Sequence, residues 1–567
     1  MVIVCFGLSI LASGFTWAQS HRAPSHIVNI TGSYHSIFLP HEPKTLSFRI
    51  VSPPPVTQNK RSESLTLAYQ VRDFKKQLVC RGSQLVKYPG NQKNWVRLTV
   101  KLPSTHQVGW FRVHLTLQSD MPNEPTRTLT TSSVDIAVMP ELRAGVTDRY
   151  FGISEQGGYS TSMPPFTQFT LPAMRRLGAN TFRFFTGWDQ MQSGPGATLD
   201  FGRMDRLLAA AEQAGIDVLP MLGRTPDFAA DPDIEGRVKR STARIPQWGH
   251  WKNFVEQMVR RYKGRIHNWE IWNEANAIGF WTGGHAEIYA TFLSKTYDLI
   301  KQIDPQAKIA LAGVSGVKTD WIQRVINAGG GPAIDVMNVH PYRFKEAFPE
   351  LGSKEFAFGY GRHSLLEDLR RVRSLMIQMP ATESGISREL WITEDGYNTS
   401  SSLKAPLHQA VSPVVQASLL VRTMTLARTE QVDRFYWWTL HSTYGGGFGL
   451  LGNQSTSFMP KPAFVAYAVL QRQMAGAQKV TLLQTKVKDL YVCRIDFPKT
   501  STCVIWTPRD PQTIHLRSSS AITQTNLMGT VEKQIPRDQV IDVPISTLPI
   551  YLSWDRDQPF EPIAEKH

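Results

Sequence analysis

The sequence predicts an α/β protein built around a (β/α)8 (TIM) barrel, with accessory β-sandwich domains formed by the N- and C-terminal segments. One observation is length: 567 residues exceed what one ordinary core holds, so two or three domains are expected. The other is a change of pattern along the chain. Strand-like runs alternate with amphipathic helices in residues 147–475, whereas strand-like runs without helices occupy both flanks.

The first residues predict export. Residues 1–18 are apolar from Val2 to about Phe15 and end in Thr-Trp-Ala before a polar stretch, which is typical of a secretory signal peptide cleaved after Ala18. The apolar run is shorter than the roughly 20 residues that a membrane-spanning helix needs, although a retained membrane anchor is the alternative. We therefore expect a secreted or periplasmic protein with no stable membrane span once the signal is removed.

Residues 27–140 predict an N-terminal β-sandwich. Their strand-like runs are TLSFRIVS, LTLAYQVR, NWVRLTVKL, GWFRVHLTLQ and SSVDIAVMP, separated by turn-forming residues. Residues 20–140 also hold 15 Lys and Arg against 6 Asp and Glu, a large share of the chain's net charge of +15. A basic excess favours an acidic polymer or an anionic surface as a partner, or is simply a solvated basic face. Nucleic acid is disfavoured because the basic residues are scattered and export is expected.

Residues 147–475 predict the barrel, because eight strand candidates alternate with helices. The expected helices cover residues 201–215, 250–264, 286–302, 365–378 and 461–474. The expected strands cover residues 149–154, 180–185, 217–222, 267–273, 308–313, 334–340, 389–394 and 434–440.

Residues 476–567 predict a C-terminal β-domain from the runs LYVCRIDF, TCVIWTP, TIHLRS and PIYLSW. These strands either form a second sandwich or complete the first. Cys493 and Cys503 lie on either side of a predicted turn at residues 498–500. They either form a cross-strand disulfide or remain two buried thiols.

Polar residues end several of the expected barrel strands, where a barrel of this kind has its active site. Asn273 and Glu274 end the fourth strand, and Glu394 ends the seventh. Two carboxyl groups facing each other across the barrel mouth are what cleavage of a glycosidic bond needs. In a retaining enzyme they act as a general acid and a nucleophile about 5–5.5 Å apart.

The chain resembles clan A glycoside hydrolases, and within them family 39. The resemblance rests on YKGRIHNWEIWNEAN, FWTGGHAEIYATFLSKTYDLIKQIDPQAKIALAG, IDVMNVHPY and ELWITEDGYN, in that order, and covers about residues 147–475. One departure is Ala275, where the family usually has proline after the acid/base. This difference affects the rigidity of the loop more than the chemistry.

The resemblance implies a role for each matching residue. Glu274 corresponds to the acid/base and Glu394 to the nucleophile, while Asn273 would hold the sugar's 2-hydroxyl group. The remaining substrate-binding or positioning residues would be His340, Tyr342 and Arg183, with Tyr342 and Arg183 close to Glu394. No cofactor or metal is implied.

Other acidic residues near the predicted strand ends have alternative roles. Asp395 competes with Glu394 for the nucleophile's role, although the family's register favours Glu394. Glu270 lies deeper in the fourth strand, and we interpret it as a structural partner for a buried Arg or Lys. Glu155 would either touch substrate or cap a loop, and Glu383 is expected in a surface loop.

Aromatic residues at or after the strand ends are candidate platforms for sugar rings, with core packing as the alternative. Glycines 279, 283 and 284 around Trp281 favour a loop there, and YGGGFGLLG at residues 444–452 is expected to be an active-site loop. The candidate platforms are Trp188, Trp281, Tyr397, Trp438 and Tyr444.

These observations predict a secreted retaining O-glycoside hydrolase that acts on a polysaccharide or oligosaccharide. Its partner would be a carbohydrate, with an acidic exopolysaccharide compatible with the positive charge and endo-action favoured by the aromatic residues. The alternative is a non-catalytic glycan-binding or surface-assembly protein on a glycosidase-like barrel. Retention of both Glu274 and Glu394 argues against that alternative.

Overall fold

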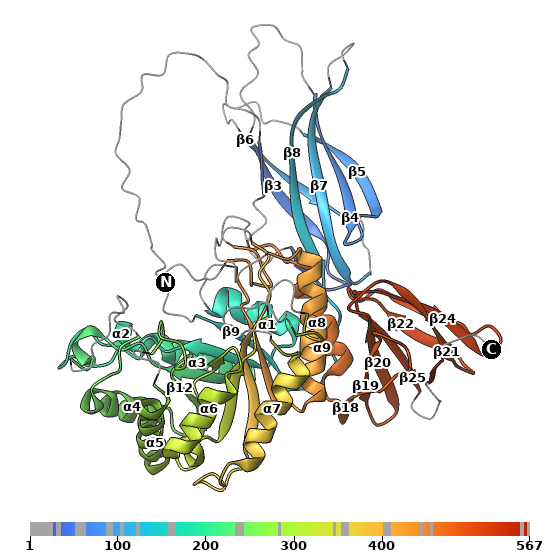
Figure 1. Cartoon of the computed structure of the whole chain (residues 1–567). Coiled ribbons are helices and arrows are strands. Elements are labelled where there is room, and N and C mark those ends of the chain that lie inside the picture. Colours follow the sequence, from blue (N-terminus) through green and yellow to red (C-terminus); the bar gives the residue numbers. More distant parts are fainter. Residues whose placement is uncertain are drawn as a thin grey trace.

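The computed structural model contains a barrel and two β-sandwiches, one formed by each end of the chain (Figure 1). The residues that it describes are 26–29, 36–51, 64–86, 95–102, 107–120, 125–156, 166–232, 243–281, 285–343, 348–352, 362–400, 410–442, 446–453, 458–555 and 561–563. The expected signal peptide and Tyr444 lie outside these ranges.

The barrel is a closed sheet of parallel strands, which confirms the predicted fold class. It runs in the order β13-β12-β11-β10-β9-β17-β16-β15, closes through a β13–β15 pairing, and is extended by the short strand β14 beside β15. Its strands are β9 (Phe151–Glu155), β10 (Thr181–Phe185), β11 (Asp217–Leu222), β12 (Asn268–Ile271), β13 (Lys308–Ala310), β14 (Val314–Ser315), β15 (Val336–His340), β16 (Glu389–Asp395) and β17 (Arg434–Trp438).

Helices between these strands cover the outside of the barrel (Figure 1). Local sequence defines their ends. Ser364 and Glu367 form a capping box at the start of α7, and Ser412 with a following proline begins α8. The helices are α1 (Leu171–Leu177), α2 (Trp188–Met191), α3 (Gly202–Gln213), α4 (Trp248–Tyr262), α5 (Ala286–Ile303), α6 (Thr319–Val325), α7 (Leu365–Gln378), α8 (Pro413–Thr429) and α9 (Pro462–Met474).

The N-terminal segment forms two antiparallel-rich sheets that enclose one apolar core. The smaller sheet has the order β1-β3-β6 and the larger the order β2-β8-β7-β4-β5. Inward-facing residues such as Phe48, Leu67 and Val113 are fully buried between them. The strands are β1 (His26–Asn29), β2 (Ile37–Phe38), β3 (Thr45–Val51), β4 (Ser64–Asp73), β5 (Leu78–Val86), β6 (Trp95–Lys101), β7 (Gly109–Asp120) and β8 (Arg127–Val138).

The C-terminal segment forms a second sandwich with its own core, which resolves the alternative left open by the sequence. One sheet has the order β18-β19-β20-β25-β22-β23 and the other β24-β21-β26. The strands are β18 (Lys479–Leu482), β19 (Tyr491–Asp496), β20 (Thr500–Trp506), β21 (Gln512–Arg517), β22 (Ile522–Thr525), β23 (Val531–Gln534), β24 (Val540–Ile545), β25 (Ile550–Asp555) and β26 (Glu561–Ile563).

The disulfide considered for this segment does not form, because the hairpin register separates the two cysteines. Cys493 pairs with Val504, and Cys503 pairs with Arg494. Cys493 therefore packs toward the barrel core, whereas Cys503 packs into the sandwich core on the other face of the sheet. Both are free, buried thiols.

Both sandwiches pack on the α8–α9 side of the barrel (Figure 1). Helix α9 contacts β7 and β8, while α8 contacts β18 and β19. The indole Nε1 of Trp110 donates to the carbonyl of Pro460 at 2.8 Å, which connects the N-terminal sandwich to a barrel loop.

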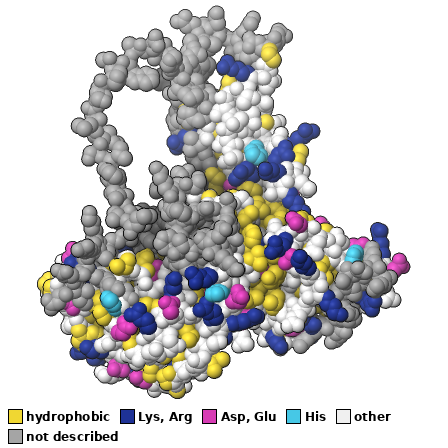
Figure 2. All heavy atoms as spheres, viewed as in Figure 1, with side chains coloured by type: hydrophobic (Ala, Val, Ile, Leu, Met, Phe, Trp, Pro, Cys, Tyr) yellow, Lys and Arg dark blue, Asp and Glu magenta, His cyan; other side chains and the backbone are white. Residues whose placement is uncertain are grey.

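On the side shown in Figure 2, Lys and Arg side chains over the barrel lie among Asp and Glu side chains. Among the described residues, no helix is both long and apolar enough to cross a membrane.

Candidate active site

A β-bulge at the end of β16 places Glu394 inside the barrel. Ile392 pairs with Phe435 but Asp395 pairs with Trp437, so β16 contains one extra residue between these pairs. Side chains alternate in a regular strand, yet Thr393 and Glu394 both contact groups in the barrel interior. The bulge explains how two consecutive side chains both reach the barrel interior, and such bulges are common beside active sites.

The end of β12 departs from regular geometry in a similar way. Trp272 has φ 73° and Glu274 has φ 45°, both in the left-handed region that non-glycine residues avoid. In a regular strand, the side chains of Glu270 and Trp272 would both point into the barrel, and that of Asn273 would point outward. Instead Trp272 packs against the helices, and both Asn273 and Glu274 contact residues of the site.

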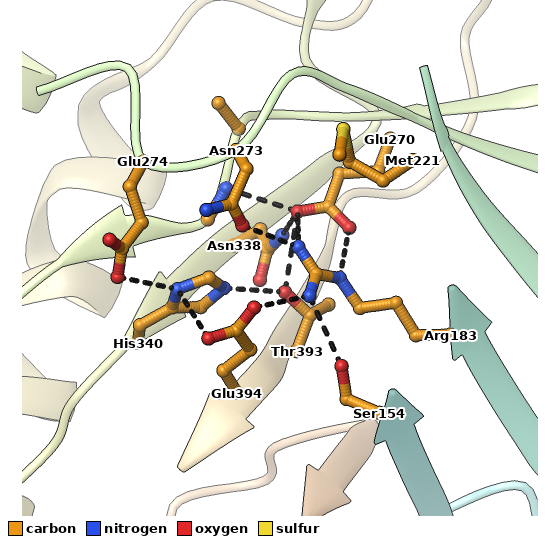
Figure 3. A network of polar contacts seen from close by, with 12 residues as sticks. Ser154, Arg183, Met221, Glu270, Asn273, Glu274, Asn338, His340, Thr393 and Glu394 are labelled. Atoms are coloured by element: carbon orange, nitrogen blue, oxygen red, sulfur yellow. Dashed lines mark hydrogen bonds and ion pairs between the residues drawn. The ribbon is translucent and has the colours of Figure 1, made fainter. Parts of the chain in front are cut away.

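Arg183 on β10 is the centre of the polar network (Figure 3). Its Nε and Nη2 donate to the two oxygens of Glu270 at 2.5 and 2.9 Å, and its Nη1 donates to Oε1 of Glu394 at 2.5 Å. Nη2 also donates to Oδ1 of Asn273 at 2.7 Å, and Nη1 to Ser154 at 3.1 Å. The predicted structural role of Glu270 and the predicted proximity of Arg183 to Glu394 match these contacts.

Glu394 accepts hydrogen bonds through both oxygens. Arg183 donates to Oε1, and the phenol of Tyr342 donates to Oε2 at 2.9 Å. Burial is the largest cause that raises the pKa of Tyr342 well above its ordinary value, with the charge of Glu394 adding to it, so the phenol remains a donor. Two donors on one carboxyl group suit its ionised form.

The surroundings of Glu274 favour its protonated form, in contrast to those of Glu394. Burial raises the pKa of Glu274 to about 7, although a hydrogen bond with Ser315 and the charge of Arg183 oppose the rise. The side chain is still open at one edge, with the residue 8% exposed. A carboxyl group with this pKa is protonated in a useful fraction of molecules near neutral pH, as a general acid requires.

His340 lies between Glu274 and Thr393, and its neutral ring links their hydrogen bonds. Burial lowers the pKa of His340 to about 4, so its ring is neutral at neutral pH. Nδ1 lies 3.0 Å from Oε1 of Glu274, and Nε2 lies 2.9 Å from the hydroxyl of Thr393. Thr393 in turn donates to Glu270 at 3.4 Å. One arrangement satisfies the series: protonated Glu274 donates to Nδ1, and Nε2–H donates to Thr393.

A glycine makes room for this histidine. A Cβ atom at Gly313 would lie 1.9 Å from Nε2 of His340. The amide of Gly313 also donates to Glu270 at 3.2 Å. Sequence reasoning missed Gly313, as well as Ser154 and Asn338, whose amide donates to Glu270 at 3.0 Å. They lie in ordinary strand sequence, and only the register across the barrel brings them to Glu270 and Arg183.

Glu274, His340 and Glu394 each offer one nitrogen or oxygen atom within 4.8 Å of the others. This donor set is compatible with a metal ion in its residue types. Arg183 and Tyr342 already donate to Glu394, however, and a guanidinium beside a carboxylate repels a cation. The arrangement is better suited to an electrophilic carbon between two carboxyl groups.

Three of the predicted aromatic platforms lie in the core instead of the site. Trp188 is 0% exposed and stacks on Phe254 with ring centroids 4.7 Å apart. Trp281 is also 0% exposed and packs against Trp272. Tyr397 is buried too, with its hydroxyl 3.2 Å from that of Thr423. A sugar ring needs an accessible aromatic face, so the predicted role of these residues is corrected to core packing.

Trp438 lies at the end of β17, where it is 7% exposed and in edge-to-face contact with Phe185. Glu155 accepts hydrogen bonds from the amide and ring of His441, which corresponds to the loop-capping alternative. Glu383 lies in an exposed loop, as expected. Oδ1 of Asp395 accepts a hydrogen bond from the amide of Gly396 at 2.8 Å.

Comparison with known proteins confirms the predicted resemblance. Residues 235–490 match the model of glycosyl hydrolases family 39. A curated β-xylosidase from Geobacillus stearothermophilus is 26% identical over 245 residues, which are 39% of this chain and 45% of that protein. The chain thus spans less than half the length of the curated relatives it matches.

Solved structures show the same fold. A family 39 glycoside hydrolase from Bacteroides cellulosilyticus superposes with a TM-score of 0.69 at 18% identity, over 93% of this chain and 99% of that chain. A β-xylosidase of the same family from Caulobacter crescentus gives a TM-score of 0.52 at 20% identity, over 72% of this chain and 97% of that chain. Similarity to family 39 therefore holds in both sequence and fold.

Proposed function

We propose that this chain, with its similarity to glycoside hydrolase family 39, is an exported retaining O-glycoside hydrolase. The observation that carries the proposal is the pairing of Glu274 and Glu394. One oxygen of each lies within 4.8 Å of the other, on opposite sides of the barrel mouth. This separation is close to the about 5–5.5 Å of retaining enzymes and shorter than the about 6.5–9.5 Å of inverting ones.

The two carboxyl groups divide the reaction between them. Glu394 attacks the anomeric carbon, and the bond to the leaving oxygen breaks as Glu274 transfers its proton to that oxygen. Arg183 and Tyr342 hold Glu394 in place for the attack. Glu274, now ionised, takes a proton from water. The resulting hydroxide-like oxygen attacks the same carbon and releases the sugar and free Glu394.

The curated relatives are β-xylosidases, so β-xylosides are the first substrates to test. Longer xylo-oligosaccharides and bacterial polysaccharides, including acidic ones, should follow. Their products distinguish endo-action from exo-action, both of which the open edge of the site allows. A non-catalytic glycan-binding protein is the alternative. Catalysis is favoured over it because Glu394 accepts two hydrogen bonds that suit a carboxylate, whereas burial raises the pKa of Glu274.

Three variants test the proposal. Glu394→Gln should reduce kcat/KM on β-1,4-xylobiose by several orders of magnitude, because the amide is a poor nucleophile. Glu274→Gln should cost roughly 10²–10⁴-fold on xylobiose but much less on β-xylosyl fluoride, whose leaving group needs little protonation. Glu383→Gln, which changes an exposed glutamate away from the site, is the matched control.

A trapped intermediate identifies the nucleophile directly. Incubation with 2-deoxy-2-fluoro-β-xylosyl fluoride should add one fluoroxylosyl group to the peptide that contains Glu394, detected by mass spectrometry. An adduct on Asp395, or full xylobiose turnover by Glu394→Gln, would contradict the assignment. Binding of xylo-oligosaccharides without hydrolysis by the wild type would instead support the non-catalytic alternative.

A further inference from the structure

A cavity of about 110 Å³ lies beside Asn273, next to the paired carboxyl groups. It is several times larger than the roughly 10–15 Å³ that one water molecule needs. Met221 and Asn273 mark its inner wall in Figure 3. The full lining is Gln156, Phe185, Met221, Gly223, Arg224, Ala243, Trp272, Asn273, Gly279 and Phe280.

Arg224 supplies a fixed polar group on this wall. Its Nε and Nη2 donate to the two carboxylate oxygens of Asp189, each at 3.0 Å, and the amide of Asp189 donates to its carbonyl at 3.1 Å. These two side-chain bonds leave Nη1 free of Asp189. The guanidinium is therefore held rigidly, as a preorganised binding group should be, and is about one-third exposed.

Phe280 supplies an exposed apolar face on the same cavity. The residue is 39% exposed, and its carbonyl accepts a hydrogen bond from Nε1 of Trp272 at 2.6 Å, which fixes its backbone. Large aromatic residues are usually buried, so an exposed one on a cavity wall is unusual. Cavities that bind small molecules combine such apolar faces with a few placed polar groups.

The backbone around the cavity is strained. Arg224 has φ 67° at the end of β11, and Trp272 has φ 73° at the end of the neighbouring β12. Non-glycine residues adopt such values at a cost, and they cluster at ligand-binding sites. A Cβ atom at Gly223 would lie 3.0 Å from the sulfur of Met221 and 3.4 Å from the ring of Trp272, so a side chain there would crowd two residues of the cavity lining.

We propose that this cavity is a second sugar-binding subsite, which holds the neighbour of the cleaved sugar in a neutral oligosaccharide. The ring face of that sugar packs on Phe280, and its hydroxyl groups accept from Arg224 and bond Asn273 or Gln156. The inference rests on the proposed function. Because Asp189 neutralises Arg224, the cavity recognises hydroxyl groups and does not select a carboxylate.

The test compares one substrate that extends into the cavity with one that does not. β-Xylosyl fluoride carries a single sugar and a very small leaving group, whereas β-1,4-xylotriose extends into neighbouring subsites. In Arg224→Gln and Phe280→Ala, the ratio of kcat/KM on xylotriose to kcat/KM on the fluoride should fall about 10- to 100-fold. Arg224→Gln keeps a non-glycine residue at the strained position, and Phe280→Ala alters an exposed side chain.

Two variants serve as matched controls. Ile278→Ala removes another exposed apolar residue of the loop after β12, and Arg324→Gln breaks a bidentate pair with Glu287 away from the cavity. Both should keep the wild-type ratio. An unchanged ratio in Arg224→Gln and Phe280→Ala, with the wild type active on both substrates, would overturn the subsite and leave the proposed function standing.

The remaining outcomes are also decisive. A wild type that cleaves neither substrate would overturn the subsite for xylo-oligosaccharides, whereas turnover of another polysaccharide would leave the proposed function standing. A third substrate, xylotriose bearing a methylglucuronic acid branch, tests the charge argument. If the wild type prefers it strongly and Arg224→Gln abolishes that preference, the cavity selects an acidic sugar and the neutral assignment is wrong.

Discussion

Ser315 limits how far burial can raise the pKa of Glu274. Burial is the larger effect and brings the pKa to about 7, while the hydrogen bond with Ser315 lowers it. The amide and carbonyl of Ser315 bond to Asn276, which holds the residue beside the acid. Sequence patterns gave no reason to select Ser315, yet its hydroxyl group opposes the effect of burial on the pKa of Glu274.

Replacing Ser315 with alanine should move the alkaline limb of the pH profile upward. The first step needs protonated Glu274, so kcat/KM falls as pH rises through the pKa of Glu274. Loss of a hydrogen bond that stabilises the ionised form raises this pKa, and activity persists to higher pH. The measurement is kcat/KM on xylobiose from pH 5 to 9. Ser374→Ala, which changes an exposed serine on α7, is the control. An alkaline limb that stays in place or moves to lower pH in Ser315→Ala would contradict the assignment of the acid.

Single residues of the site were predictable to different degrees. The placement of Asn273, Glu274 and Glu394 could be predicted because they stand in the quoted motifs at strand ends, and the resemblance implied Arg183 beside Glu394. The aromatic platforms could not, since a tryptophan near a strand end packs equally well on helices or on a sugar. Trp281 follows a glycine-rich pattern but contacts α5 residues such as Phe292, and only tertiary packing decides between these positions.

At the scale of elements, the loop after β17 is anchored by polar side chains of its neighbours. Asn398 accepts from the amide of Gly447 at 2.7 Å, and Gln416 donates to the carbonyls of Gly447 and Phe448. Lys461 donates to Gly447 at 2.6 Å and to Thr399 at 3.0 Å. The anchored Phe448 packs edge to face on Tyr342, the residue that donates to Glu394.

Lys461→Met should change how stability depends on pH. Burial lowers the pKa of Lys461 to about 7, whereas an unfolded lysine titrates near 10.4. Between these values the unfolded state binds one more proton, so the wild-type free energy of unfolding should rise by about 1.4 kcal/mol per pH unit relative to the variant. Below about pH 7 the difference should be constant.

Chemical denaturation at pH 6, 7, 8 and 9 measures this difference. Lys533→Met, which removes an exposed lysine from β23, should show no such slope. A Lys461→Met difference that stays flat across the range would mean that the buried ammonium keeps its proton in the folded protein.

Strand positions were more predictable than the conformation at strand ends. The expected strand at 217–222 coincides with β11, and the fourth expected strand, 267–273, ends earlier, at Ile271. Hydrophobic pattern locates a strand, but the left-handed Trp272 and the bulge in β16 depend on contacts across the barrel. The same limit applied to the cysteines, because the hairpin register shifts by one residue and pairs Cys493 with Val504 and Cys503 with Arg494.

At the scale of the whole molecule, a buried ion pair joins the barrel to the C-terminal sandwich. Glu350, in the loop after β15, accepts from Nε and Nη2 of Arg422 on α8 at 2.8 and 2.5 Å. Its Oε1 also accepts from the indole of Trp506 on β20 at 2.6 Å. All three side chains are almost fully buried, so the contact belongs to the folded interior shared by both domains.

Arg422→Met should lower the free energy of unfolding by about 3–5 kcal/mol, because it leaves Glu350 buried without its cation. The double variant Glu350→Gln/Arg422→Met should recover much of this loss, since no charge then remains. Thermal or urea unfolding provides the measurement. Arg324→Met, which breaks an exposed pair, should have little effect, and an equal effect of the two arginine variants would show that burial is unimportant here.

The largest apolar core is assembled from distant parts of the chain. It combines barrel residues with Ile37 and Trp110 near one end and with Trp506, Met528 and Tyr551 near the other. During synthesis the barrel strands leave the ribosome long before the last of these residues, so one flank of α8 and α9 stays uncovered until translation is nearly finished. We expect nascent chains stopped after residue 475 to bind chaperones and to resist protease only weakly, and chains extended past residue 555 to become protected.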